Sequence, residues 1–116
     1  MSIKSTGISL TVLVKMRSGG SGINKIIDMK RIYKYPVPVD DKFVLELPLG
    51  SMVLTVQMQK SEPQIWVLCN PDAIKVKRYF YVYGTGMEVS EKALNYIGTF
   101  QMLAGGLIFH LFEGEK

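Results

Sequence analysis

Short alternations of apolar and polar residues run along most of this chain, and turn-forming residues separate them. Residues 42–47 alternate, with Phe43, Leu45 and Leu47 on one side. A period of two is typical of a strand with one buried face. The same signal predicts strands around Tyr33, at residues 52–59, 64–70 and 75–83, and on both sides of Gly105-Gly106. Nowhere do apolar residues follow helical spacing over ten positions, so we expect at most one helical turn, near residues 90–94.

Turn signals at intervals of about ten residues complete this pattern. Together they predict an all-β fold, a small antiparallel β-sandwich or barrel of six to eight short strands.

The last hairpin carries the clearest turn signal. Gly105-Gly106 can adopt the positive φ angles of a two-residue turn. That turn would place Gln101 opposite His110 on an amphipathic face, with Phe100 and Met102 on the core face.

A second hairpin is predicted around the loop 60–63. With Gln59 opposite Gln64, Gln57 would lie opposite Trp66. Both hairpins would then pair an apolar face with a face that combines glutamine and an aromatic ring.

Length and charge indicate one folded domain with an extension. The chain has 116 residues and a net charge of +4, of which residues 1–28 contribute +3 (four basic residues and one acidic). Residues 17–22 resemble a Gly/Ser linker. We therefore expect an N-terminal extension at 1–28, either disordered or adding one strand, and a single β domain at 29–116. No apolar run approaches the about 20 residues of a membrane-spanning helix, and the lone Cys69 suits a reducing compartment, so we expect a cytoplasmic protein.

The residues of this chain give little support for a catalytic function. The chain has one His and one Cys, and the predicted faces put Cys69 in the core and His110 on the opposite face. Metal sites need three or four clustered ligands, which the spacing does not provide. Gly84-Thr85-Gly86 is read as a turn, with a phosphate cradle of backbone amides as the alternative. We therefore expect no enzyme, no metal and no cofactor.

Binding is the better supported class of function. Glutamine amides beside flat rings suit a small planar or polar partner. In the alternative, Trp66 and His110 only cap the edge of the sandwich. The candidate binding residues are Gln57, Gln59, Trp66, Gly84, Thr85, Gly86, Gln101 and His110.

Several segments, in order, resemble a family of small uncharacterised proteins of bacteriophages, prophages and bacteria. They are residues 32–36, 45–48, 56–59, 65–68, 83–86, 96–101 and 109–113, so that the resemblance covers roughly residues 30–113. In that family a His often follows the Gly-Thr-Gly turn, where this chain has Met87, so this position is not proposed as an acid, base or ligand. The resemblance implies a setting and no reaction.

Together these features predict a phage-type accessory protein that binds a host protein or a small molecule, in a host-interaction or counter-defence role. One alternative is a structural or assembly module of a virion. Another is a weak nucleic-acid-binding module built on Lys75, Lys77, Arg78 and the tyrosines at 79, 81 and 83. Open sheet edges and an exposed tyrosine face also predict a homo-oligomer, with a dimer favoured.

Overall fold

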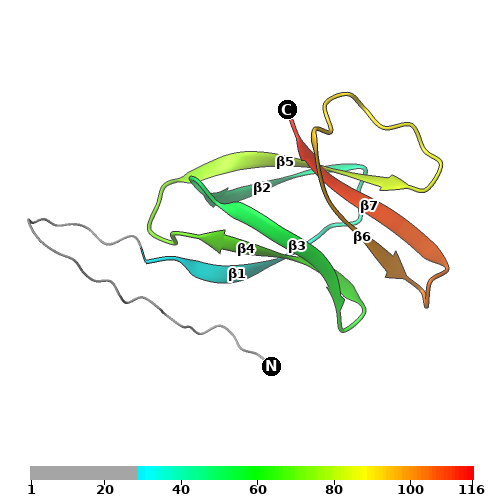
Figure 1. Cartoon of the computed structure of the whole chain (residues 1–116), viewed down its shortest axis with the longest axis horizontal. Coiled ribbons are helices and arrows are strands. Elements are labelled where there is room, and N and C mark those ends of the chain that lie inside the picture. The colour runs from blue at the N-terminus through cyan, green and yellow to red at the C-terminus, as the bar shows by residue number, and fades with distance from the viewer. Residues whose placement is uncertain (1–28) are drawn as a thin grey trace, which may run out of the picture.

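Two antiparallel sheets pack face to face in the computed structural model, which describes residues 29–116 (Figure 1). The three-stranded sheet has the order β1 (Arg31–Pro36), β4 (Glu62–Cys69), β3 (Met52–Gln59). The four-stranded sheet has the order β2 (Lys42–Pro48), β5 (Lys75–Gly84), β7 (Leu107–Gly114), β6 (Asn95–Met102). The all-β sandwich prediction is therefore confirmed. The predicted extension at 1–28 lies outside the described residues.

The core lies between the two sheets and uses the inward face of every long strand. Phe80, Leu47, Ile65 and Leu111 are the largest fully buried side chains, and the rings of Phe43 and Phe80 stack with centroids 5.1 Å apart. β3 and β6 lie next to each other across the two sheets, where Gly98 faces Val56. Within residues 29–116 no helix is long and apolar enough to cross a membrane.

The register of the last hairpin differs from the predicted one. The turn comprises four residues, 103–106, and Leu103, Ala104 and Gly105 all have positive φ. Gln101 therefore lies opposite Ile108, and His110 lies opposite Thr99. The predicted pairing of Gln101 with His110 is wrong by two residues, although an even shift keeps both side chains on the predicted face.

The hairpin of β3 and β4 shows the reverse error. Its turn contains only Lys60 and Ser61, with φ of 50° and 70°, so that Glu62 and Pro63 belong to β4. Positive φ at both positions is the geometry of a type I′ turn, which glycine or asparagine usually provides. Gln57 lies opposite Gln64, and Trp66 lies opposite Thr55. The alternation in residues 52–59 predicts that Met52 and Leu54 face the core together with Val56, but a bulge between Val53 and Thr55 turns both outward.

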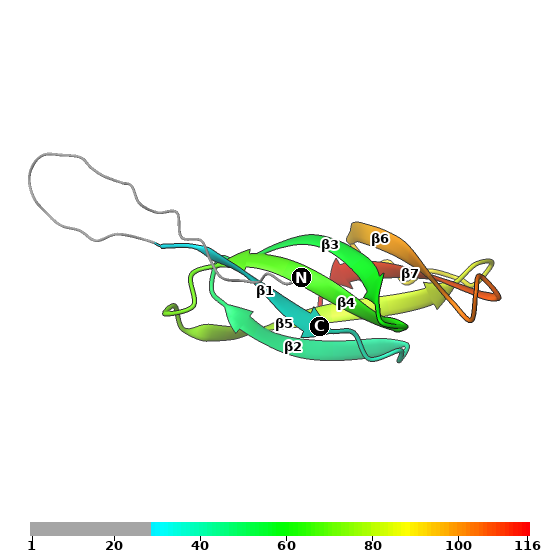
Figure 2. The ribbon, with the colours of Figure 1, turned by 90° about the horizontal axis from the view of Figure 1, so that it is seen from below.

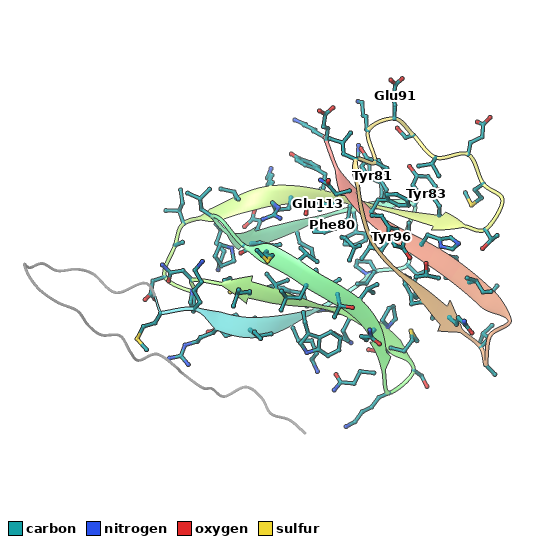
Figure 3. All side chains as sticks on the ribbon, viewed as in Figure 1. Phe80, Tyr81, Tyr83, Glu91, Tyr96 and Glu113 are labelled. Carbon is teal, nitrogen blue, oxygen red and sulfur yellow. The ribbon has the colours of Figure 1, made fainter. Side chains whose placement is uncertain are left out.

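Tyr81 and Tyr83 are buried, although they point away from the core between the sheets. Their relative exposures are 7% and 8%, so the predicted exposed tyrosine face is wrong at these positions. Figure 3 shows them where the loop after β5 meets the ends of β5 and β7. The Tyr83 hydroxyl accepts a hydrogen bond from the Ser90 amide at 3.0 Å, and the Tyr81 hydroxyl donates to the Glu115 carbonyl. The loop between β5 and β6 therefore covers these rings. The periodicity of the sequence does not predict the position of such a loop.

The loop itself contains the predicted turn near residues 90–94. The Ala93 amide donates to the Ser90 carbonyl at 3.0 Å, and the Lys92 amide donates to the Ser90 hydroxyl at 3.0 Å. This is one hydrogen-bonded turn with Ser90 at its start, as the sequence predicts. The Leu94 amide then donates to the Glu113 carbonyl and joins the loop to β7.

Candidate functional site

The outer face of the three-stranded sheet forms the first candidate surface, which we call the tryptophan face. Cross-strand pairing arranges its side chains in three rows. They are Ile32, Leu68 and Met52; Lys34, Trp66 and Thr55; and Pro36, Gln64 and Gln57, with Gln59 beyond the last row. Because directly paired residues share one side of a sheet, each row lies on the same outer face. The apolar row and the glutamines thus occupy opposite ends of it.

Apolar side chains on this face are unusually exposed. Ile32 is 50% exposed, Met52 is 58% exposed and Leu54, at the bulge, is 42% exposed, while Leu68 and Trp66 are half-buried. The outer face of an antiparallel sheet normally carries polar residues. A contiguous apolar row beside a tryptophan therefore marks a surface suited to a partner.

Hydrogen bonds hold the amide end of the tryptophan face in place. The Lys34 ammonium group on β1 donates to the side-chain carbonyl of Gln59 on β3, across the central strand. The Gln57 amide donates to the Thr55 hydroxyl at 3.2 Å. Gln64 is buried, so its polar group contributes little exposed surface. The predicted residues Gln57, Gln59 and Trp66 thus share one face, with Gln57 diagonal to Trp66.

The second candidate surface is the His110 cluster, made of Thr85, Tyr96, Thr99 and His110 on the outer face of the four-stranded sheet. His110 Nε2 lies 2.8 Å from Thr85 Oγ1, and its Nδ1 lies 2.9 Å from Thr99 Oγ1. The Tyr96 hydroxyl bonds Thr99 Oγ1 in turn. In the neutral imidazole one ring nitrogen donates and the other accepts, and threonine hydroxyls can serve both. Both polar atoms of His110 are therefore satisfied within the protein.

The predicted site residues on this sheet separate into two positions. Thr85 and His110 come together because the turn 84–86 folds back against β7, with the Met87 amide donating to the Gly84 carbonyl and φ of +94° at Gly86. Gln101 lies farther along the same face, beside its own turn, where its Oε1 would be 3.2 Å from a methyl group on Gly105. The prediction of a shared Gln101 and His110 site is not supported by this register.

Thr99 and Tyr96 are site neighbours that the sequence analysis missed. Their position five and two residues before Gln101 already placed Tyr96 and Thr99 on the same strand, but the register decides which of them meets His110. Tyr96 is 60% exposed and its ring meets Phe112 edge-on with centroids 5.5 Å apart. Phe112 also meets the ring of Tyr83 edge-on, with centroids 5.8 Å apart.

Other chemical groups are kept apart or buried. Cys69 is 1% exposed on the inner face of the other sheet, and burial raises the pKa of its thiol, so the reactive thiolate is disfavoured. Burial likewise raises the pKa of Tyr35 on the neighbouring strand. Across residues 29–116, no three His, Cys, Asp or Glu side chains gather closely enough to hold a metal ion.

A family described as Domain of unknown function (DUF7352) matches residues 29–116. The chain belongs to this family. No curated protein and no solved structure matches the chain. Every described strand of this DUF7352 protein lies within the matched residues.

Arg78 of the DUF7352 domain lies apart from Lys75 and Lys77. Arg78 shares the inward face of β5 with Phe80 and binds the Glu113 carboxylate through two nitrogens, with Nη2 to Oε1 at 3.0 Å. Its Nη1 donates to the Ser51 carbonyl at 2.9 Å. Lys77, one residue before Arg78 on the strand, points to the other side of the sheet. Arg78 is therefore separated from the predicted nucleic-acid patch, whereas Lys75 and Lys77 remain on the same side of β5 as the tyrosines.

Replacing His110 with alanine should lower the free energy of unfolding by about 1–2 kcal/mol, because two side-chain hydrogen bonds are lost at about 1 kcal/mol each. Urea denaturation followed by circular dichroism measures this change. Gln101→Ala is the control, and an exposed side chain of this kind should change stability by less than about 0.5 kcal/mol. Equal effects of the two substitutions would contradict a linking role for His110.

Proposed function

We propose that this protein acts by stoichiometric binding and not by catalysis, and that its partner is a protein of a bacterial host cell. In this proposal it is a phage- or prophage-type accessory protein in the host cytoplasm, where it occupies a host component or counters a defence system. The resemblance of residues 30–113 to phage and prophage proteins supports the setting. The tryptophan face supports the mode of action.

The observation that carries this proposal is the exposed apolar row beside Trp66. Protein interfaces combine an apolar centre, enriched in tryptophan and methionine, with a polar rim and few charges at the centre. The tryptophan face has Met52, Leu68 and Ile32 at one end and glutamines at the other. Lys34 is its only cation within the three rows, and it is already hydrogen-bonded to Gln59.

A protein partner fits this surface better than a small molecule does. Sites for small molecules are concave and enclose most of the ligand. The tryptophan face is instead the outer side of a three-stranded sheet, and rows of three residues follow one another across it. A flat surface of this kind has to gain its binding energy from area, which a protein can supply.

Substituting Met52→Glu should abolish capture of the partner while leaving the fold intact. A charge on a side chain that is 58% exposed costs little in the free protein but is desolvated without a counter-charge in a complex. The measurement is native mass spectrometry of tagged protein recovered from lysate of the bacterial host. We expect a stoichiometric protein partner whose recovery falls at least tenfold with Met52→Glu.

Ile74→Glu provides the matched control, because Ile74 is 70% exposed but lies in the turn between β4 and β5, outside the tryptophan face. It should leave recovery unchanged. A retained small molecule in place of a protein would contradict the proposed partner. A large homo-oligomer with no host protein would favour the assembly role in a virion.

A further inference from the structure

The four edge strands of the sandwich differ in their chemistry. β1 and β3 are the edges of one sheet, and β2 and β6 are the edges of the other. Proteins commonly prevent edge strands from pairing with other chains by placing charges or proline there. β1 contains Arg31, Lys34 and Pro36, and β2 contains Lys42, Glu46 and Pro48. β3 and β6 contain no charged residue and no proline.

Both uncharged edges lie along the same side of the molecule. A methyl group on Gly98 of β6 would be 2.7 Å from Val56 Cγ1 of β3, so the two strands approach closely there. Figure 2 shows β3 and β6 together on one side of the sandwich. β3 and β6 belong to different sheets and do not form a ladder with each other. Within residues 29–116, no strand pairs with the outer edge of either of them.

We propose that a second copy of this chain occupies this side, with β6 paired antiparallel to β6 of the partner about a twofold axis. In such an interface each residue meets its own kind or a near neighbour, so a charged strand would repel its copy. β6 carries no charge and is rich in residues that favour strands. The pairing extends the four-stranded sheet into a continuous eight-stranded one.

The register shift in β6 indicates where the proposed twofold axis lies. The register shift between Tyr96 and Gly98 leaves Gly98–Met102 as the regular part of the strand. A twofold axis at Phe100, the centre of this part, places Thr99 opposite the partner's Gln101. Both have polar side chains on the outer face, where they can hydrogen-bond.

Sedimentation velocity of the full chain at 1–200 µM tests the assembly. We expect a reversible monomer–dimer equilibrium with the dimer dominant at the highest concentration. Hydrogen exchange of the same protein at low and high concentration then locates the interface. Within Gly98–Met102, the amides that point away from β7 should exchange at least tenfold more slowly at high concentration, while amides of β1 and β2 should not change.

Charge substitutions test the register without depending on one variant. Gln101→Lys should weaken the dimer at least tenfold, whereas Ile108→Lys should not, because Ile108 lies opposite Gln101 on the interior strand β7. Mixing Gln101→Lys with Gln101→Glu should restore dimers, since opposite charges then meet across the axis. Circular dichroism melting confirms that each variant is folded.

Three results would overturn this proposal: a monomer at 200 µM, a dimer whose concentration-dependent protection lies on β1 or β2, or equal weakening by Gln101→Lys and Ile108→Lys. None of them bears on the proposed function, because Met52 and not Gln101 defines the host-protein test. Loss of the host partner with an intact dimer would leave the present proposal standing.

Discussion

Replacing Gly114 with alanine should lower the free energy of unfolding by about 2–4 kcal/mol, combining the loss of hydrogen bonds with displacement of a packed loop. An added methyl group would overlap the Lys92 carbonyl oxygen and lie 2.8 Å from the Lys92 carbonyl carbon. Because these atoms belong to the backbone, no side-chain rotation relieves the contact. The loop that covers Tyr81 and Tyr83 therefore has to move away from β7.

The expected loss includes two backbone hydrogen bonds at this contact. The Glu115 amide donates to the Lys92 carbonyl at 2.9 Å, and the Leu94 amide donates to the Glu113 carbonyl at 3.1 Å. Urea denaturation measures the free energy, and hydrogen exchange should show faster exchange at Leu94 and Glu115. Gly84→Ala is a matched control, since Gly84 also ends a strand but its added methyl would meet only the Met87 side chain, at 3.4 Å. Equal stability losses at the two glycines would contradict this account of the loop.

Replacing Phe80 with alanine should lower the free energy of unfolding by about 3–5 kcal/mol, the usual cost of removing a buried ring. Phe80 has no exposed surface and stacks on Phe43 across β2 and β5. It also follows Arg78 on the same face of β5, so its loss leaves a cavity next to the pair of Arg78 and Glu113. Chemical denaturation of the purified variant measures the effect.

Ile74→Ala serves as the comparison for Phe80→Ala. Ile74 is 70% exposed, so its truncation should change stability by less than about 0.5 kcal/mol. A loss of less than 1 kcal/mol at Phe80 would mean that the ring is not packed between the sheets as described.

Strand positions were largely predictable because each depends on a local alternation. Phe43 and Leu47 are buried as the alternation in residues 42–47 predicts, and β1 ends at Pro36 as expected of a residue that cannot donate to a ladder. The turn after β4 also follows from its residues, since the Asn70 side chain accepts a hydrogen bond from the Asp72 amide at 3.0 Å.

Hairpin registers were not predictable from turn residues alone. The glycine pair at 105–106 suggested a two-residue turn, yet Leu103 and Ala104 adopt positive φ and lengthen it. Lys60 and Ser61 form a two-residue turn without glycine. Positive φ at such residues costs free energy that the pairing and packing of the strands must offset, so the tertiary structure selects these turns.

The candidate sites also combine features that the sequence predicted with features that it could not predict. The sequence placed Gln57 and Trp66 on one outer face and Gln101 and His110 on another, because an error of two residues leaves the facing of a strand unchanged. It could not predict that Thr85 and Thr99 satisfy both nitrogens of His110, since that contact joins three segments whose register was wrong or unknown.

The sequence by itself determined that this protein is all-β and, except at the bulge of β3, which residues can line its core and which side of each hairpin faces outward, because a period of two is a local property. Only the tertiary structure decided that a loop buries Tyr81 and Tyr83, that Arg78 binds Glu113 35 residues away, and that the uncharged edges β3 and β6 share one side. These features depend on which distant segments come into contact. The order of the strands in the two packed sheets determines those contacts.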